Sequence, residues 1–484
     1  MTRPAPRLTI LPVLLILTGC AVGPDYHRPA FATPATFKEA AIWQPAQSPN
    51  PAMPEPHGDW WKIYGDAQLD ELIPQLLLSN QNIAAAAAQL RQTQALLEAA
   101  NSARFPVLGA SLSGTRASSP GAAGSVSPAN AVKLALNASW EPDLWGRIGR
   151  NVEAGQASVQ ASKADLDSAR LSAQLTLAQT VFQLRVADAQ RALLAQTIKA
   201  DERSLEITRN RQSAGVASRL DVVQAETQLE SARAQASDMA TQRARLEHAI
   251  ALLTGKTPAE LSLAAITGLP ALPPLPEMLP AALLERRPDI AAAERRVAAA
   301  NAAIGISQAA WFPSLTFNAS GGYQNNSLSR LLTQPHRFWS LGPSLALTIF
   351  DGDARSAEQA GAMAAYDKTV ALYRQVVLTA FQEVEDNLAT LNGLHEEIAS
   401  QTRATRSADE ALKIAETQYR AGVVSYLNVV TAQTTALTAR RALITLQGQI
   451  LSAHAMLLKT FAGDFPSRKE QSHLIPIQPA PPSP

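Results

Sequence analysis

The chain has 484 residues, and its 42 basic and 41 acidic side chains leave a formal net charge of only +1. This balance provides no basic field for a nucleic acid, so we expect no nucleic-acid partner. Aromatic residues make up 5 % of the chain while alanine is abundant, which favours long helices over an aromatic-rich core. Beyond the N-terminal apolar run no stretch approaches the roughly 18 apolar residues of a transmembrane helix, so any membrane crossing would need β-strands.

The first 19 residues, 1–19, have the build of a secretory signal peptide. Arg3 and Arg7 precede roughly ten mostly apolar residues, a run too short for a membrane-spanning helix of about 20. The sequence LTGC, which ends at Cys20, then resembles a bacterial lipobox, in which the signal is cut before the cysteine and the thiol carries a lipid. Cys20 is the only cysteine of the chain, so it cannot form an internal disulfide. We expect a covalent lipid such as palmitate on Cys20, and a buried structural cysteine is the alternative.

Two halves of the chain repeat each other at an offset of about 207 residues. The segment ARFPVLGASLSG from Ala103 matches AWFPSLTFNASGG from Ala310, and RQSAGVASRLDVVQAETQL from Arg211 matches YRAGVVSYLNVVTAQTTAL from Tyr419. Proline-rich sequence separates the halves and ends the chain, and it cannot be helix interior. The predicted segments are a signal peptide (1–19), a lipid-anchored extended segment (20–62), a first strand/helix repeat (63–267), a proline-rich connector (268–280), a second strand/helix repeat (281–465) and a proline-rich tail (466–484).

Each half contains two segments in which apolar residues alternate with small polar ones. This period of two, with Gly- and Ser-rich loops between the segments, fits the lipid-facing and lumen-facing alternation of outer-membrane barrel strands. One face of a soluble sheet would show the same period. The apolar positions are Leu108, Ala110 and Leu112; Leu134, Leu136, Ala138 and Trp140; Leu315, Phe317 and Ala319; and Leu345, Leu347 and Ile349.

Four strands per chain are too few to close a barrel. Even a small barrel needs about eight strands, and open sheet edges are not tolerated in lipid. A barrel would therefore be shared between chains, with 8 strands from two copies or 12 from three, since each half of the chain provides two strand segments.

Helical periodicity without proline covers about 151–211 and about 357–421. At 1.5 Å per residue, some 60 residues make a rod of roughly 90 Å, which no ordinary globular domain needs. In the second rod Val377, Val384 and Leu391 lie one heptad apart, as does the preceding Val370, so this helix carries a coiled-coil seam.

A turn follows each rod and leads into another helix. Gly215 and Gly422 are able to take the left-handed conformation that ends the outgoing helix. Ser218 and Ser425 are placed to cap the returning helix. Asp221 stands three residues after Ser218 and completes a pattern similar to a capping box. Each pair of helices is therefore predicted to form a hairpin with a polar tip.

The sequence shows no catalytic or metal-binding motif. TGKT at 254–257 lacks the upstream glycine of a phosphate-binding loop, where Ile250 stands instead. His395 is followed by two glutamates but not by the second histidine of a zinc-protease helix. We therefore predict a protein that is not an enzyme, with no catalytic residue, no metal site and no cofactor besides the lipid on Cys20.

Several motifs together carry a family resemblance. They are GCAVGPDYHRP, WWKIYGDAQLDELI from Trp60, NASWEPDLWGRIGR from Asn137, LLERRPDIAAAERR from Leu283 and the two A-G-V turns. This set resembles the TolC-type outer-membrane efflux proteins, and within them the NodT-like lipoprotein branch associated with resistance-nodulation-division pumps. The resemblance runs in order through the mature chain to about Pro466.

The resemblance implies a mainly α fold with a β-barrel, built from two tandem repeats that each provide two barrel strands and a long coiled-coil helix hairpin. It implies a homotrimer with a 12-stranded barrel in outer-membrane lipid and an α-helical tube in the periplasm. The implied partners are a periplasmic adaptor protein and an inner-membrane resistance-nodulation-division pump. The chain would then be a passive exit duct for small molecules such as drugs or other toxic compounds, driven by the pump.

The same resemblance assigns roles to the two turns. It places the adaptor-facing end at these turns and a narrow aperture just after the second one. Leu427 matches the hydrophobic aperture position, whereas Thr431 stands where an acid is often found. Asn428 and Asp221 remain the polar aperture candidates, although capping is the favoured role for Asp221. The predicted tip residues are Ala214, Gly215, Val216, Ser218, Ala421, Gly422, Val423 and Ser425.

A different class of function stays open at this point. A lipid-anchored coiled-coil scaffold could tether the layers of the envelope without conducting anything. The alternating strands favour the duct, because a tether needs no amphipathic strands.

Overall fold

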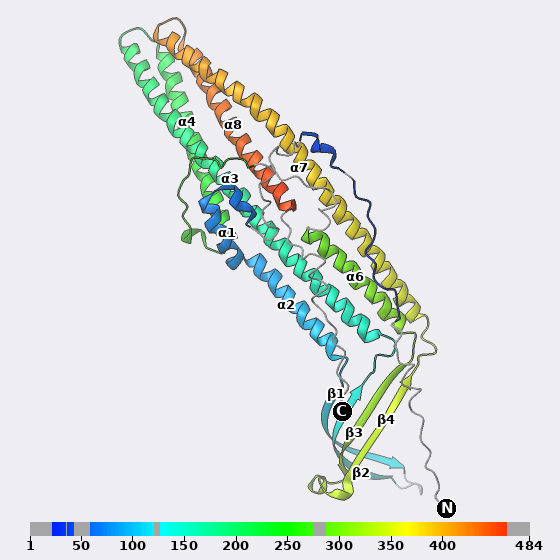
Figure 1. Ribbon diagram of the computed structural model, residues 1–484. Helices are drawn as coiled ribbons and strands as arrows, with labels where there is room; N and C mark the ends of the chain where they lie inside the picture. Colours follow the sequence, from blue (N-terminus) through cyan, green and yellow to red (C-terminus); the bar gives the residue numbers. More distant parts are fainter. Residues whose placement is uncertain (1–21, 35, 43–58, 121–125, 274–286, 462–484) are drawn as a thin grey trace, which may run out of the picture. The chain divides into compact units, whose positions relative to one another are not determined.

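A computed structural model of the chain describes residues 22–34, 36–42, 59–120, 126–273 and 287–461 (Figure 1). Cys20, the proline-rich tail and part of the predicted connector lie outside the described residues. In the first half, the elements are η2 (Lys38–Ile42), η3 (Trp60–Tyr64), α1 (Ala67–Ser79), α2 (Gln81–Ser102), β1 (Val107–Pro120), β2 (Val126–Trp140), α3 (Arg147–Ser213), α4 (Arg219–Leu253) and η4 (Pro258–Glu260).

The second half repeats the same order, which confirms the predicted tandem arrangement of two strands followed by a long helix hairpin. Its elements are α6 (Pro288–Ala309), β3 (Ser314–Asn325), η5 (Leu328–Arg330), η6 (Gln334–His336), β4 (Arg337–Ala346), α7 (Ala354–Arg420) and α8 (Tyr426–Phe461).

The chain divides into two compact units, and each unit draws on both halves of the sequence. Unit 1 consists of Met1–Phe31, Ala88–Lys163 and Ala292–Gln375, and it contains all four strands. Unit 2 consists of Ala32–Ala87, Ala164–Ala291 and Val376–Pro484, and it contains both helix turns. Each tandem repeat is therefore continuous in the sequence, whereas each compact unit combines segments from both repeats.

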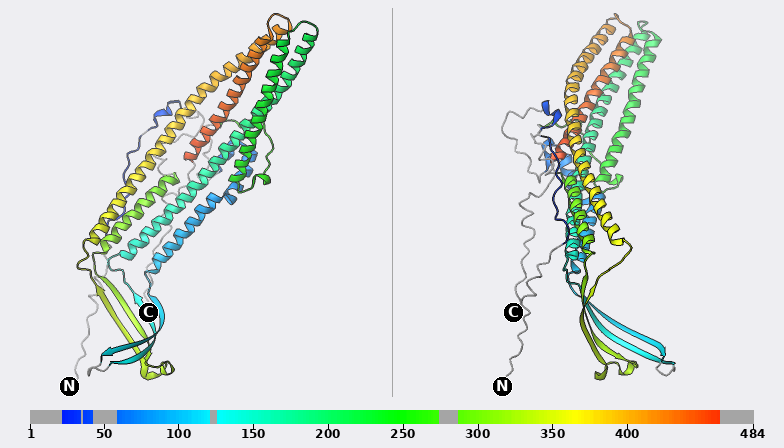
Figure 2. Two further views of the ribbon diagram at one scale, coloured as in Figure 1. Left: turned by 180° about the vertical axis from the view of Figure 1, so that it is seen from behind. Right: turned by 90° about the vertical axis from the view of Figure 1, so that its right-hand side faces the viewer.

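The four strands of unit 1 form one antiparallel sheet in the order β1-β2-β3-β4 (Figures 1 and 2). Directly paired residues share a face of a sheet, so the register identifies the two faces. Leu108, Ala138, Ala319 and Leu341 line up across the strands on one face. The neighbouring row on the opposite face is Gly109, Asn137, Ser320 and Ser340. The predicted alternation of apolar and small polar residues is thus present in the folded sheet.

The last strand ends earlier than its sequence pattern indicates. β4 stops at Ala346, so Leu347 and Ile349, which were expected to continue the alternation, lie beyond the strand. Ala346 pairs with Ser314, the first residue of β3. The preceding Pro313 has no N–H to donate, so the ladder has no partner for a longer β4.

The two long helices begin a few residues before the predicted ranges. α3 starts at Arg147 because the carboxylate of Asp143 accepts the Ile148 N–H at 3.0 Å, which satisfies one of the free amides of the first turn. In α7 the heptad positions Val377, Val384 and Leu391 are buried in unit 2, which confirms the predicted seam. Among the described residues no helix is both long and apolar enough to span a bilayer.

Unit 2 also encloses charged side chains. The guanidinium of Arg185 on α3 binds both carboxylate oxygens of Asp66, at 2.9 and 2.8 Å, and both side chains are buried. Asp66 in turn accepts the Leu69 N–H at 3.1 Å and so caps α1. This bidentate pair attaches the short helix α1 to the long helix α3 through a fixed geometry.

Candidate functional site

The two predicted hairpin turns lie side by side at one end of unit 2 (Figures 1 and 2). Gly215 has a φ of 75° and Gly422 has a φ of 77°, so both glycines adopt the left-handed conformation. In the first turn the Val216 N–H donates to the Arg211 carbonyl oxygen at 2.8 Å. In the second, the Val423 N–H donates to the Gln418 carbonyl oxygen at 2.9 Å. Both turns are therefore Schellman-type helix ends, and glycine provides the conformation that they require.

The returning helix of the first hairpin starts with a complete capping box. The Ser218 hydroxyl oxygen accepts the Asp221 N–H at 3.1 Å, and the Asp221 carboxylate accepts the Ser218 N–H at 3.0 Å. At the corresponding place in the second hairpin, the Asn428 N–H donates to the carbonyl oxygen of Ser425 at 3.2 Å. The predicted capping role of Asp221 is thus observed in the structure.

Aromatic and cationic side chains join the two hairpins just below the turns. Tyr419 on α7 and Tyr426 on α8 meet edge to face, with 5.1 Å between ring centroids. Arg211 on α3 lies over the Tyr419 ring at 4.9 Å and donates to the Arg420 carbonyl oxygen at 3.0 Å. Ser204 on α3 shares a hydrogen bond of 3.1 Å with the Tyr426 hydroxyl. The first hairpin is therefore locked to the second by specific contacts as well as by apolar packing.

A buried carboxylate lies in α3 near this junction. Asp201 is only 2 % exposed, and its Oδ2 atom has no hydrogen-bond partner. Burial, together with the negative charge of Glu416 on α7, raises the pKa of Asp201 to about 6. A carboxylate held in this way favours its neutral form, because the folded protein gives its charge too little solvation.

Three of the four aperture candidates share one exposed face at the start of α8, while Asp221 lies in the first turn of α4 and is half-buried. Leu427 is 54 % exposed, and Asn428 and Thr431 are exposed as well. The Thr431 hydroxyl donates to the Leu427 carbonyl oxygen at 2.9 Å, so it is satisfied within its own helix. Tyr426 and Val429 face the other way and are buried in the core beneath the turns. This face of α8 is therefore left free of packing within the chain.

The predicted tip residues Ala214, Gly215, Val216, Ala421, Gly422 and Val423 are all exposed, as are Ser218 and Ser425. Reasoning from the sequence missed the Tyr419, Tyr426, Arg211 and Asp201 cluster that holds the tip together. The only local signal was that a tyrosine flanks the second turn on each side.

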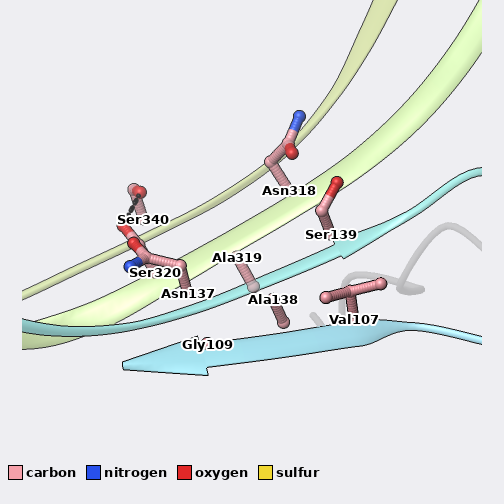
Figure 3. Close-up of a pocket in the computed structure, with 9 residues that line it drawn as sticks. All are labelled: Val107, Gly109, Asn137, Ala138, Ser139, Asn318, Ala319, Ser320 and Ser340. Atoms are coloured by element: carbon pink, nitrogen blue, oxygen red, sulfur yellow. Dashed lines mark hydrogen bonds between the residues drawn. The ribbon is translucent and has the colours of Figure 1, made fainter. Parts of the chain in front are cut away.

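The polar face of the sheet in unit 1 is the second notable surface. A shallow hollow of about 450 Å³ lies on it, lined by small side chains without any charge. Figure 3 shows Asn137, Ser139, Asn318 and Ser320 along this face, with the Ser320 and Ser340 hydroxyl groups 2.8 Å apart. Among the described residues no group of three or more His, Cys, Asp or Glu side chains is arranged to hold a metal ion.

Comparison with known proteins gives a consistent match. The family model described as "Outer membrane efflux protein" matches residues 72–256 and 279–463, so each half of the chain carries one copy. The chain is 30 % identical to the probable efflux pump outer membrane protein TtgC of Pseudomonas putida, over 96 % of this chain and 97 % of the relative. It is 32 % identical to the outer membrane protein OprJ of Pseudomonas aeruginosa, over 90 % of each chain.

Solved structures agree with the sequence comparison. The structure of the outer-membrane channel OprN superposes with a TM-score of 0.85 at 30 % identity, covering 92 % of this chain and 100 % of that one. The open state of the outer membrane channel MtrE of Neisseria gonorrhoeae superposes with a TM-score of 0.80 at 27 % identity, covering 92 % and 98 %.

Proposed function

Because this chain belongs to the outer membrane efflux protein family, we propose that three copies of it form the exit duct of a tripartite efflux pump. The observation that carries the proposal is the sheet of unit 1. Large apolar side chains stand exposed on one face, among them Leu112, Trp339 and Leu341, while small polar side chains cover the other face. A soluble sheet would bury the apolar face, whereas a sheet in a membrane turns it to lipid.

The number of copies follows from the edges of the sheet. β1 and β4 are its outer strands, and each leaves a row of backbone groups unpaired within the chain. Such edges are costly in lipid, so β4 of one copy must pair with β1 of the next. Three copies of four strands give a closed sheet of 12, in agreement with the trimer that the family resemblance implies.

The partners in this proposal are a periplasmic adaptor and an inner-membrane pump of the resistance-nodulation-division type. The exposed turns at Gly215 and Gly422 offer the adaptor a rigid surface, since both are fixed by Schellman bonds and by the tyrosine contacts beneath them. Energy for transport would come from the pump, as the family resemblance implies. The scaffold alternative is disfavoured, since a tether would gain nothing from an amphipathic sheet.

The cargo is proposed to be small molecules that the pump selects. Relatives of this chain are named for different cargoes, namely a toluene efflux pump in Pseudomonas putida and a cation efflux system in Escherichia coli. One duct architecture therefore serves chemically different substrates. This supports a passive duct in which the pump, and not a binding pocket in this chain, selects the cargo.

The lipid on Cys20 is part of the same proposal. A lipobox cysteine followed by Ala21, and not by aspartate, suits delivery to the outer membrane. We expect metabolically supplied palmitate to label the wild-type chain and not a Cys20→Ser variant. Labelling of that variant would contradict the lipobox assignment. The duct itself should assemble without the lipid, since the closed sheet anchors the trimer.

Conductance in planar bilayers tests the duct directly. The full chain, purified as a trimer and studied with and without its adaptor, should give discrete openings, and a scaffold should give none. Leu427→Ser should raise the resting conductance, because it replaces an apolar side chain at the proposed aperture. Leu220→Ser is the matched control, because Leu220 is 64 % exposed beside the first turn but is not an aperture candidate. Equal increases in both variants would contradict the role of Leu427.

A further inference from the structure

The strands carry very few charges, and all of them are positive. Their 51 residues include Arg116 on β1, Lys133 on β2 and Arg337 on β4, with no acidic residue in any strand. The register assigns each of these side chains to one face of the sheet. The three positive charges can therefore be compared by the face of the sheet on which each side chain lies.

Only Lys133 lies on the polar face. It pairs with Ser113 on β1 and with Gln324 on β3, in the same alternating row as Asn137. Arg116 shares the alternation of Leu112 on β1, and Arg337 shares that of Leu341 on β4, so both belong to the apolar face. The polar face that Figure 3 shows in part thus has a single charged side chain in each copy of the described sheet.

The Lys133 ammonium is held in a defined place. Its Nζ lies 4.8 Å from the centroid of the Phe338 ring on β4, two strands away. Phe338 pairs with Gly322 on the intervening β3, and this glycine adds no side chain beside the ring. A Cβ atom at Gly322 would come within 2.0 Å of the Leu134 carbonyl oxygen. The glycine therefore allows close pairing of β2 and β3.

No carboxylate neutralises this charge in the described part of the chain, where Lys133 forms a cation–π contact and no ion pair. A cation–π contact attracts the ammonium to the ring but supplies no negative charge to compensate it. In a closed sheet of three copies, one such ammonium from each copy would stand at the same level. Charges in such a confined space raise the local concentration of counter-ions.

We propose that Lys133 gives the strand part of the duct a preference for anionic over cationic solutes. The inference rests on the proposed function, because it takes the polar face of the sheet as the lining of the lumen. Solutes bearing a carboxylate, phosphate or sulfonate group are attracted to this level, while cationic solutes meet an electrostatic barrier. The effect weakens with salt, since the Debye length falls from about 10 Å at 0.1 M to about 3 Å at 1 M.

Reversal potentials across planar bilayers test the proposal. The full trimer is measured under a KCl gradient at low salt, and the chloride-to-potassium permeability ratio is derived for each variant. Lys133→Gln should lower this ratio by about twofold or more, and Lys133→Glu should lower it further, as the local potential reverses sign. Lys133→Arg should keep the wild-type ratio. All variants share the remaining length of the duct, so a difference between them reports on this position alone.

Arg116→Gln is the matched control, because it removes a positive charge from the apolar face of the same sheet and should leave the ratio unchanged. Openings whose ratio is the same in wild type, Lys133→Gln and Lys133→Glu would overturn the inference while leaving the duct intact. Equal shifts in Arg116→Gln and Lys133→Gln would overturn it too, since the face would then not matter. Absence of any opening in the wild type with its adaptor would overturn the proposed function, and this inference with it.

Discussion

At the scale of single residues, Asp201 is a buried carboxylate whose ionised form destabilises the folded protein. Its carboxylate lacks a partner for Oδ2, and burial beside Glu416 raises its pKa to about 6. The folded protein therefore holds a proton between about pH 4 and pH 6 that the unfolded chain has already released. Stability should fall as the pH rises through this window and stay lower above it. The buried acid thus makes the junction between the hairpins less stable at neutral pH than in acid.

Asp201→Asn should remove this dependence. At pH 7.5 the variant should be more stable than the wild type by on the order of 2 kcal/mol, and at pH 4 the two should be nearly equal. Melting temperatures of the detergent-solubilised trimer, measured from pH 4 to pH 8, would show the difference. Asp238→Asn is the control, because this aspartate on α4 is exposed and its replacement removes no buried carboxylate. A difference that is constant with pH would refute the explanation.

At the scale of elements, the hairpin turns depend on one backbone conformation. Gly215 has positive φ and open space around the position of a Cβ atom, so a side chain there meets backbone strain and no clash. Gly215→Ala should therefore lower the free energy of unfolding by about 1 kcal/mol. The strain falls on the tip that is proposed to face the adaptor, so adaptor binding should weaken as well.

Gly393→Ala is the control, and it should change the stability of the protein in the opposite direction. Gly393 lies in the interior of α7, is exposed, and also has open space around its Cβ position. Its replacement by alanine should raise helix stability by up to about 1 kcal/mol. Denaturation of both variants side by side would separate the two effects. If both substitutions stabilised the protein, the left-handed turn would not be the reason for glycine at position 215.

At the scale of the whole molecule, the proposed duct requires that the apolar face of the sheet contacts lipid. Ser340 and Leu341 are neighbours on β4 that belong to opposite faces, and Leu341 is 73 % exposed. Leu341→Arg should cost about 2 to 4 kcal/mol if its position is near the middle of the bilayer. Ser340→Arg should be tolerated, because Ser340 belongs to the opposite face, which is the proposed lining of the water-filled lumen. The folded trimer recovered in lipid vesicles measures the difference, and equal recovery of both variants would contradict a lipid-facing Leu341.

Local sequence patterns predicted most of the elements, because the interactions that start and end them act within a few residues. Gly215 and Gly422 end their helices because of a preference of their own backbone, and the Ser218 and Asp221 capping box is completed within four residues. The error at the end of β4 has a different origin. Leu347 and Ile349 continue the alternation, but the strand stops where its partner β3 begins, and that partner is more than thirty residues away in the sequence.

In the candidate site, too, the features set by local sequence were predicted and those set by contacts between distant segments were not. The exposed tip at both turns was predicted from the turns themselves and from the family resemblance. The tyrosine pair, the Arg211 contact and the burial of Asp201 were not predicted, because each depends on the packing of one hairpin against the other. The cation–π contact between Lys133 and Phe338 was not predicted either, because it depends on the register of three strands.

By itself, the sequence determined the tandem repeat, the long helices, the glycine turns and the two-sided strands, because periodicity and backbone preference act over a few residues. The tertiary structure alone decided which residues share a face, where β4 ends, which charges are buried and how the two hairpins lock together. These depend on contacts between segments far apart in the sequence, such as Ser314 with Ala346 in the sheet and Arg211 with Arg420 between the hairpins. For such contacts the free energy comes from desolvation and geometry that exist only after the chain has folded.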